Sequence, residues 1–301
     1  MKLAPIVIFS YNRPSHLKKT LNSLKKNKLS KKSIAYFFSD GPKTHTLEEL
    51  KKINLVRKII KNTKGFKSKK IIFYKKNIGL KKNILNGVTK IIKKHGKVIV
   101  LEDDIVVTKN FLNYMNQSLS LYATNKKIWH ISGWNYDLDL KKINKGDEDA
   151  FFIRNMNCWG WGTWKNHWNK IILDPNFFYK KMNKKQIENF NLSNSINNWS
   201  QIIRNKNKTL ETWAIFWNAT IFYYKGLCLN PKISMINNIG MDGSGTNSHI
   251  AKTKILKLSK IKSFNFPSLI KEDFELRNKI ISYMNYKKWK NFKIKILSIF
   301  K

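Results

Sequence analysis

Apolar and polar positions in the first 133 residues alternate between a strand pattern and a helix pattern. Short continuous apolar runs predict five buried strands, at 6–9, 34–38, 71–74, 98–101 and 128–132. Between these runs, apolar residues recur every three or four positions and predict helices after Pro14 and around 47–59, 84–92 and 111–119. Strands and helices that alternate over short connections predict an α/β fold, with a mostly parallel central sheet covered by helices on both faces.

The pattern continues less regularly in the second half. Residues 134–150 are polar and predict a loop, and residues 241–249 are rich in Gly and Ser. Helices are predicted near 194–205 and 211–225, and short strands at 227–229 and 234–236. The chain from 250 onward is very basic. No Gly- or Pro-rich linker divides it, so we expect one domain followed by a basic tail.

The sharpest chemical feature is the acidic triplet Glu102-Asp103-Asp104, directly after the apolar run KVIVL. Ligands of an open parallel sheet bind beyond the carboxyl ends of its strands. Adjacent carboxylates repel one another there unless a cation joins them, and Mg²⁺ or Mn²⁺ takes oxygen ligands and also bridges diphosphates. The triplet therefore predicts a divalent-cation site rather than a solvated turn. The triplet at 147–149 has no strand before it, and we interpret it as solvated.

Further polar residues follow the first three predicted strands. Ser10 and Arg13 follow the first, where a guanidinium beside a helix N-terminus suits a phosphate or a base edge, or is simply exposed. Asp40 follows the second and could accept the imide N–H of uracil or a ribose hydroxyl, or serve as a turn residue. After the third, Asn77 and Gly79 form either a helix entry or a close approach of backbone to a ligand.

Two common nucleotide-binding signatures are absent from these turns. A dinucleotide-binding domain would place GxGxxG after the first strand, where the sequence reads SYNRP. No GxxxxGK[ST] loop occurs either. NAD, FAD and P-loop chemistry are therefore not expected.

The charge of the chain is large but diffuse. The 301 residues are 42% apolar, enough for one sizeable core, and 59 Lys and Arg against 18 Asp and Glu give a net charge of +41. Lysine is spread over nearly every predicted helix, so most of the charge is interpreted as solvated surface. A remainder favours phosphate-bearing substrates and anionic lipid, and no nucleic-acid partner is expected.

The cysteines and the apolar runs indicate in which cellular compartment the protein is expected. Cys158 and Cys228 form no CxxC pair, which fits a reducing cytosol. The apolar run near the N-terminus is too short to span a membrane, and no stretch elsewhere is long enough. We expect a cytoplasmic protein that is soluble or peripheral on the inner face of the cell membrane.

Four segments carry a family resemblance: PIVIFSYNRP, FFSDGPK, NIGLKKNI and VIVLEDDI, in that order and spacing. Together they resemble bacterial GT-A glycosyltransferases (family 2-like), and more narrowly the bacterial relatives of N-acetylglucosaminyltransferase I. The segments NCWGWGTW and GLCLNPKISMINNIGMDGSGT are similar to the same group. The resemblance extends over residues 4–249.

The resemblance implies a nucleotide-diphospho-sugar transferase domain over 1–249, with a nucleotide-sugar-binding half at 1–133, an acceptor-binding half at 134–249, and a basic helical tail at 250–301. It implies an inverting, metal-dependent transfer from a nucleotide-sugar donor, chiefly a UDP-sugar, to a glycan or lipid-linked acceptor. Surface polysaccharide or lipopolysaccharide biosynthesis is the implied setting. By position, Asp104 would ligate Mn²⁺ or Mg²⁺, Glu102 and Asp103 would contact the sugar or ribose, and Arg13 and Asp40 would contact the nucleotide.

A tryptophan cluster follows the polar loop. Indole faces stack on pyranose rings, and glycine lets backbone approach a sugar, so Trp159, Gly160 and Trp161 are interpreted as a wall that contacts sugar. The alternative is an aromatic block in the core. Trp164 and Trp168, spaced i and i+4, are interpreted as core.

An inverting transfer needs a base for the acceptor hydroxyl, and Glu211 is the first candidate. It is expected to open the helix ETWAIFWNATIFYY, where related enzymes carry an acid; the alternative is an acid favoured only by the helix dipole. Ala214 stands where the eukaryotic enzymes have Asp, so Asp242 is the second candidate. Asp242 begins a Gly-rich loop, 242–246, expected to close over the donor.

One late histidine is a candidate metal ligand. His249 would complete the metal shell, although Asn247 stands where relatives place this histidine.

The last residues, KKWKNFKIKILSIFK at 287–301, have an amphipathic pattern. Wound as a helix, they gather one apolar side, formed by Trp289, Phe292, Ile296, Ile299 and Phe300. With its lysines, such a helix could lie on an anionic membrane. The alternative is that its apolar side packs on the domain.

Two other functions compete with the glycosyltransferase interpretation. A sugar nucleotidyltransferase has a similar fold but would show a Gly-rich signature after the first strand. A non-enzymatic nucleic-acid-binding protein would concentrate its positive charge on a motif, and here the charge is diffuse.

Overall fold

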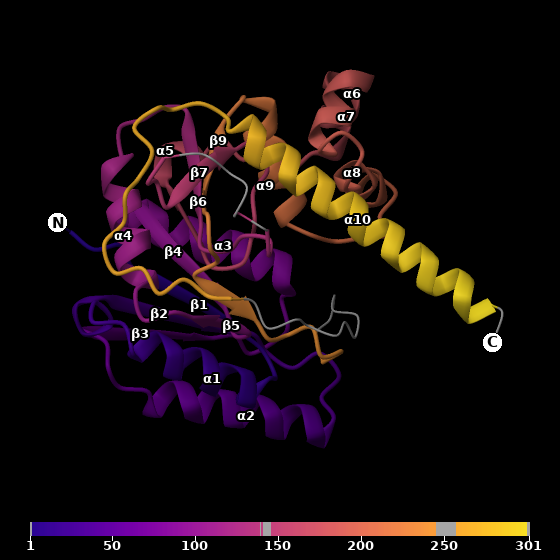
Figure 1. Ribbon diagram of the computed structural model, residues 1–301. Helices are drawn as coiled ribbons and strands as arrows, with labels where there is room; N and C mark the ends of the chain where they lie inside the picture. Colours follow the sequence, from indigo (N-terminus) through magenta and orange to yellow (C-terminus); the bar gives the residue numbers. More distant parts are fainter. Residues whose placement is uncertain (1, 139, 141–145, 245–256, 300–301) are drawn as a thin grey trace.

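An eight-stranded sheet organises the protein, whose computed structural model describes residues 2–138, 140, 146–244 and 257–299. Its strand order is β3-β2-β1-β4-β8-β6-β9-β7 (Figure 1). The strands are β1 (Ile6–Ser10), β2 (Ile34–Ser39), β3 (Ser68–Phe73), β4 (Lys97–Glu102), β6 (Ile128–Ser132), β7 (Ala150–Ile153), β8 (Trp161–Trp164) and β9 (Leu227–Pro231). A separate two-stranded sheet pairs β5 (Ile105–Val107) with β10 (Ile236–Asn238).

The strand directions confirm the mostly parallel sheet. Strands β3, β2, β1 and β4 pair in parallel, and so do β6 and β9. Strand β8 runs antiparallel between β4 and β6, and β7 runs antiparallel to β9 at the edge. The hydrophobic pattern predicts β1 to β4, β6 and β9. It does not predict β5, β7 and β8.

Helices cover both faces of the sheet. Successive residues of each strand point to opposite sides, so each strand contributes to both layers of the core. Ile6 and Ile8 of β1 pack in one cluster, whereas Val7 and Phe9 pack in the other. The first cluster is covered by α1 (Pro14–Lys25), α2 (Leu47–Asn62) and α4 (Phe111–Leu121), and the second by α3 (Leu80–His95), α5 (Lys165–Trp168) and α9 (Ala214–Tyr223).

A smaller helical layer packs on the outer side of α9. Phe178, Phe190 and Ile202 form a separate buried cluster with Phe216 of α9. This layer is built from α6 (Pro175–Lys181), α7 (Lys184–Phe190) and α8 (Asn198–Lys206); a 3-10 helix, η1 (Ser30–Lys32), lies in the first half of the chain.

The chain after residue 257 runs along the same body before it forms the last helix. Asn110 donates to the carbonyl of Ile261 at 2.7 Å, and the hydroxyl of Tyr122 donates to the carbonyl of Pro267 at 2.8 Å. Helix α10 (Phe274–Ile299) buries Leu276 against strand β7 in one cluster. The basic helical tail expected from 250 therefore begins as part of the packed body, and the distal half of α10 extends away from it (Figure 1).

The tryptophan cluster is core rather than a wall that contacts sugar. Trp161 is 1% exposed, and its ring stacks between His130, at a centroid distance of 5.4 Å, and Trp213, at 5.2 Å. Because β8 lies between two strands of a sheet covered on both faces, its side chains have no route to solvent. The prediction for Trp161 is therefore wrong, and the core interpretation of Trp164 and Trp168 is confirmed.

The two residues before β8 have different places. Gly160 is buried with a φ of +62°, a left-handed conformation that favours glycine, and its carbonyl accepts the N–H of Gly133 at 2.7 Å. It is a turn residue, so its prediction as a sugar contact is also wrong. Trp159 is half-buried against Trp134, with ring centroids 4.9 Å apart, and stays a candidate.

Candidate active site

The acidic triplet lies at the carboxyl end of a central strand, as the sequence predicts. Strand β4 ends at Glu102, which pairs in register with Phe9 near the end of β1. Asp103 and Asp104 form the turn between β4 and β5. The three acids therefore occupy the sheet edge where open parallel sheets bind their ligands.

Arg13, which follows β1, turns toward the two aspartates. Its Nη2 atom forms an ion pair with Asp103 and lies 3.0 Å from Oδ2 of Asp104. Burial lowers the pKa of Arg13, but Asp103 and Asp104 outweigh that effect and raise it above its ordinary value. The guanidinium therefore supports the acid cluster rather than standing exposed, and sequence reasoning missed this pairing because it depends on two adjacent strand ends.

The positive charge of Arg13 does not balance the charge of the three acidic side chains. Burial, together with the carboxylates of Asp104 and Asp103, raises the pKa of Glu102 to about 8. Burial also raises the pKa of Asp103 to about 6, although Arg13 opposes this. The cluster therefore has an excess of negative charge that a cation would relieve.

A divalent cation fits the chemistry of this cluster. Within the described residues, no group of three or more His, Cys, Asp or Glu side chains is arranged to hold a metal ion. Mg²⁺-type sites commonly use one or two carboxylates and complete their shell with water and substrate phosphates. Asp104, whose side chain is 12% exposed against 3% for Asp103, is the better placed of the two aspartates to offer an oxygen outward.

The segment after β10 closes tightly over the triplet. The N–H of Ile239 donates to the carbonyl of Asp104 at 2.9 Å. A Cβ atom on Gly240 would lie 2.1 Å from Oδ2 of Asp104 and 2.8 Å from Nη1 of Arg13. A larger residue at this position would therefore push the charged side chains of Asp104 and Arg13 out of their present positions.

Asp242 reaches the rim of the site through the same segment. Its Oδ2 atom lies 3.1 Å from Nε2 of His16 on helix α1, and Ser244 donates to Oδ1 through its N–H and its hydroxyl. The hydrogen bond from the Ser244 hydroxyl is the main reason why the pKa of Asp242 is lowered to about 2. No pattern in the sequence singles out His16, and His249 lies outside the described residues.

The residues after β2 and β3 that are predicted to contact the nucleotide lie close together, but they form hydrogen bonds chiefly with one another. Asp40 is 4% exposed; its Oδ1 accepts the N–H of Gly41 at 2.8 Å and of Ile78 at 2.9 Å, and its Oδ2 accepts the N–H of Gly79 at 3.1 Å. Asn77 donates to the carbonyl of Gly41 at 3.0 Å. Asp40 thus fixes the turn that would face a ligand.

The same turn is tied to the first strand. The N–H of Asp40 donates to the carbonyl of Ser10 at 3.0 Å, and Ser10 itself is 6% exposed. The residues predicted to bind the nucleotide therefore lie at the ends of adjacent strands, beside the acid cluster.

Glu211 does not open a helix as expected. It is exposed in the turn between α8 and α9, and α9 begins at Ala214 after the N-cap Trp213. The helix-dipole alternative for this acid is therefore wrong as well. Trp213 stacks on Trp161, which pairs with Val100 two residues before Glu102, so this turn lies at the acid-bearing end of the sheet.

The acid cluster has one supporting contact that the sequence does not predict. The hydroxyl of Tyr11 donates to Glu49, whose carboxylate also accepts the N–H groups of Thr44 and His45 at 2.9 and 2.8 Å. The Tyr11 hydrogen bond is the main cause that lowers the pKa of Glu49 to about 2. The N–H of Tyr11 also donates to Oδ2 of Asp103 at 3.2 Å. Tyr11 therefore links the acid cluster to the loop after β2.

The two cysteines are not candidates for chemistry. Both are free, and burial, followed by the nearby carboxylate of Glu102, raises the pKa of Cys158 to about 12. Burial likewise raises the pKa of Cys228 far above its ordinary value. Neither thiol forms a thiolate near neutral pH, so neither serves as a nucleophile.

Comparisons with known proteins give one family match and several distant structures. The model of the GNT-I family matches residues 1–180, which hold β1 to β8 and the acid triplet. No curated protein sequence matches the chain.

The similar structures are remote. S. aureus TarS 1–349 in complex with UDP is 16% identical, with 46% of this chain and 39% of that chain covered and a TM-score of 0.32. The mannosyltransferase PcManGT from Pyrobaculum calidifontis, in complex with GDP-Man and Mn²⁺, is 7% identical, with 75% and 70% covered and a TM-score of 0.42. The aligned part amounts to 20% of the length of the longer TarS chain, so this chain spans less than two fifths of the first two structures that it matches.

Proposed function

Because the chain belongs to the GNT-I family of glycosyltransferases, we propose that it transfers a sugar from a nucleoside-diphosphate donor, chiefly a UDP-sugar, to a glycan or lipid-linked acceptor. Surface polysaccharide or lipopolysaccharide biosynthesis is the proposed setting. One observation carries the proposal: three acids and one arginine meet at the carboxyl end of β4, where charge is undercompensated. A diphosphate that arrives with a divalent cation matches this arrangement.

The proposed donor site divides into three parts. Asp104 would hold Mn²⁺ or Mg²⁺, which when bound supplies Lewis-acid stabilisation of the leaving diphosphate. Glu102 and Asp103 would accept hydroxyls of the sugar or ribose, with Arg13 holding the aspartates in place. The base and ribose would lie along the strand ends that carry Ser10, Asp40, Asn77 and Gly79.

The proposed reaction is a single displacement with inversion. An acidic residue, Asp242 or Glu211, removes the proton of the acceptor hydroxyl as its oxygen attacks the anomeric carbon. The bond from that carbon to the diphosphate oxygen breaks, and its electron pair leaves with the nucleoside diphosphate. Trp159, half-buried before β8, remains the proposed aromatic contact for a sugar, and His249 remains a proposed further ligand of the cation.

Donor screening tests this function directly. We expect release of nucleoside diphosphate from a UDP-sugar in the presence of Mn²⁺, with lower rates for GDP-sugars and for release of CMP from CMP-sugars. Nucleotide release is measured for each donor with and without EDTA. Pyrophosphate release from a nucleoside triphosphate and a sugar 1-phosphate, with none from nucleotide sugars, would instead indicate a nucleotidyltransferase.

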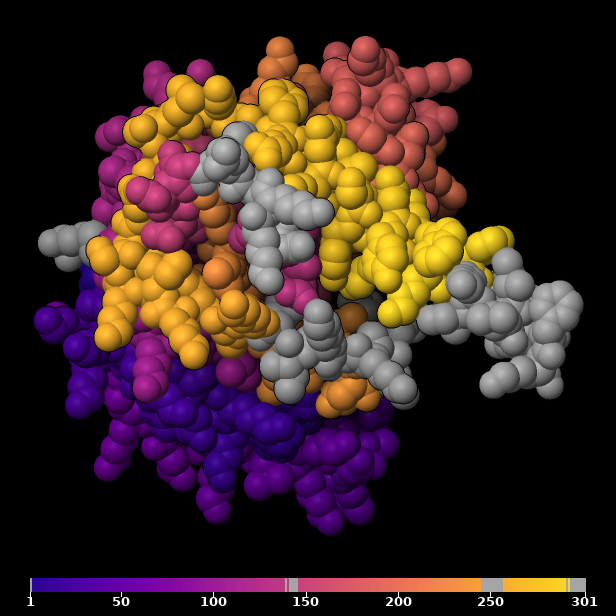
Figure 2. Space-filling view, viewed as in Figure 1, coloured from indigo at the N-terminus to yellow at the C-terminus, as the bar shows by residue number. Residues whose placement is uncertain are grey.

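We also propose that the distal half of α10 places the enzyme on the inner, anionic face of the cell membrane. Tyr286, Trp289 and Phe292 are 58%, 57% and 64% exposed. By helix geometry they lie about 150° around α10 from the side that packs on the domain. Figure 2 shows this part of the helix standing out from the body.

The charge around these aromatics suits anionic lipid. Lys287, Lys288 and Lys290 are exposed on the same helical segment. Aromatic side chains favour the headgroup region, and basic residues near it are attracted by about 1 kcal/mol each. No helix of the described residues is long and apolar enough to cross a bilayer. Attachment would therefore be to the surface, where a lipid-linked acceptor lies.

Vesicle flotation separates this contact from the general basicity of the protein. We expect wild-type protein to float with phosphatidylglycerol-containing vesicles but not with neutral phosphatidylcholine vesicles. In Trp289→Ala/Phe292→Ala, partitioning should fall about tenfold or more, because each buried aromatic contributes a few kcal/mol. The control Leu47→Ala/Leu121→Ala removes two exposed apolar residues elsewhere, 77% and 59% exposed. Equal losses in both double variants would refute a specific role for α10.

A further inference from the structure

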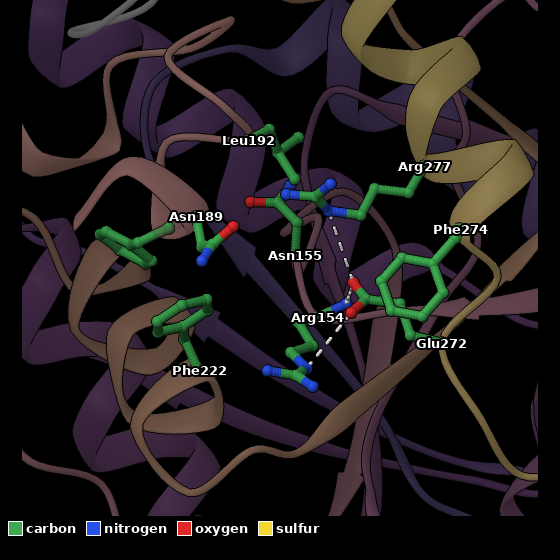
Figure 3. Close-up of a pocket in the computed structure, with 9 residues that line it drawn as sticks. Arg154, Asn155, Asn189, Leu192, Phe222, Glu272, Phe274 and Arg277 are labelled. Carbon is green, nitrogen blue, oxygen red and sulfur yellow. Dashed lines mark hydrogen bonds and ion pairs between the residues drawn. The ribbon is translucent and has the colours of Figure 1, made fainter. Parts of the chain in front are cut away.

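A cavity of about 240 Å³ lies away from the acid cluster, between the end of β7, helices α7 and α9, and the start of α10 (Figure 3). Its walls combine two arginines, Arg154 and Arg277, with one acid, Glu272, and with aromatic and amide side chains. Strand β7 runs antiparallel to β9, so its carboxyl end lies at the edge opposite to the acid triplet. In the sheet it is also four strands from β4, which is about 19 Å at ordinary strand spacing.

The charge in this cavity is not balanced. Oε2 of Glu272 lies 3.3 Å from Nε of Arg154, and Oε1 lies 3.8 Å from Nε of Arg277. The side chain of Glu272 is 8% exposed, so one buried carboxylate faces two guanidinium groups. Among the described residues that line the cavity, two arginines therefore face one acid, an arrangement that favours an anion.

The hydrogen bonding of Arg154 is also incomplete. Its Nε atom is buried and makes no hydrogen bond within the described residues, because the contact with Glu272 lacks hydrogen-bond geometry. In Figure 3 the terminal nitrogens of Arg154 point away from Glu272, on the side of Phe222. The side chain is 38% exposed, so these terminal nitrogens, rather than the Nε that faces Glu272, are the donors that a bound anion would engage.

The other walls suit a sugar ring. Phe222, half-buried, and Phe274, 62% exposed, offer aromatic faces, and Asn189 offers an exposed amide that can bond hydroxyls. Pockets for drug-sized ligands span about 300–1,000 Å³, so the cavity suits one small ring rather than a chain of sugars. A guanidinium fork matches the two oxygens of a carboxylate or phosphate.

We propose that this cavity binds one anionic sugar unit, bearing a carboxylate or a phosphate, at a site separate from the donor site. In an extended glycan acceptor this unit would lie several residues from the hydroxyl that reacts. The glycan part of this proposal rests on the proposed function, whereas the binding of a free anionic sugar does not.

Saturation-transfer NMR titrations with glucuronic acid, glucose 6-phosphate, glucose and inorganic phosphate test the site. We expect both anionic sugars to bind at least tenfold more tightly than glucose. Arg154→Gln should weaken them by about 10- to 100-fold, the usual range for a charged hydrogen bond. Phe274→Ser, which alters an exposed side chain, should weaken the anionic sugars severalfold and leave inorganic phosphate unchanged.

Controls separate this site from the surface charge and from the donor site. Arg204→Gln removes an exposed arginine of α8 and should change nothing. Equal affinity for glucose and glucuronic acid, or no effect of Arg154→Gln, would overturn the proposal. So would inorganic phosphate binding as tightly as glucose 6-phosphate, because the aromatic walls would then contribute nothing. Donor turnover is not measured in these titrations, so a failed donor screen and a failed titration remain distinguishable.

Discussion

Replacing Asp104 by alanine is expected to abolish metal-dependent binding of UDP and to lower turnover by about 10³-fold or more. In the proposed site this carboxylate would hold the cation that the donor diphosphate also needs, and such an ion would contribute several kcal/mol to transition-state stabilisation. Asp104 is the better placed aspartate because Asp103 is more deeply buried in its ion pair with Arg13. Calorimetry with UDP, with and without Mn²⁺, measures the binding.

Stability measurements guard against a trivial loss of fold. Removing Asp104 relieves its repulsion with Glu102 but also breaks its pair with Arg13, so the two effects oppose each other and the melting temperature should change little. Asp147→Ala is the matched control, because Asp147 belongs to the second acidic triplet and is exposed. It should bind UDP and Mn²⁺ as the wild type does. Unchanged UDP affinity in Asp104→Ala and in EDTA would rule out the metal role.

The parallel half of the fold could be predicted because its strands are buried on both faces. A strand such as IVIFS is apolar at every position, and the helices between strands repeat at the helical period. Strand β8 reads WGTW, and its burial comes from β4 and β6 on either side, which sequence spacing does not reveal. Sequence spacing likewise does not reveal the neighbours of Trp161, which is why the sequence predicts a sugar contact where the structure has core.

The acid cluster was predictable in position but not in partners. Its place after KVIVL follows from the rule for parallel sheets. The pairing of Arg13 with both aspartates depends on β1 lying next to β4. No local sequence pattern reveals that these two strands are neighbours. Similarly, the second triplet is only partly solvated, because Asp149 accepts the N–H of Asn265 at 2.8 Å. That contact joins two segments 116 residues apart.

The prediction that a helix begins at Glu211 is wrong, and the reason is local. Helix α9 begins three residues later, at Ala214, and Thr212 instead donates its N–H to Asn205 of α8 at 3.3 Å. The acid therefore lies in a turn that α8 holds, rather than in the first turn of α9. Its predicted catalytic role rested on the family pattern for that helix, so the choice of base becomes a question of geometry at the acid cluster.

The catalytic base is expected to be Asp242 rather than Glu211. Asp242 follows Gly240, which lies against Asp104 and Arg13, whereas Glu211 lies in a turn that is linked to the sheet through the stacking of Trp213 on Trp161. We expect Asp242→Asn to retain donor affinity and lose about 10²–10⁴ in kcat, the usual contribution of a positioned base. Glu211→Gln should stay within about threefold of wild-type kcat, as expected for a residue outside the chemical step.

The contact between Asp242 and His16 supplies the decisive control. If Asp242 served only to anchor its segment on α1, His16→Gln would break the same contact and lower kcat as much as Asp242→Asn does. If Asp242 removes the acceptor proton, His16→Gln keeps the carboxylate and should retain most of the activity. Single-turnover rates with saturating donor measure the chemical step in all three variants. A large loss in Glu211→Gln with near-normal Asp242→Asn would assign the base to Glu211 instead.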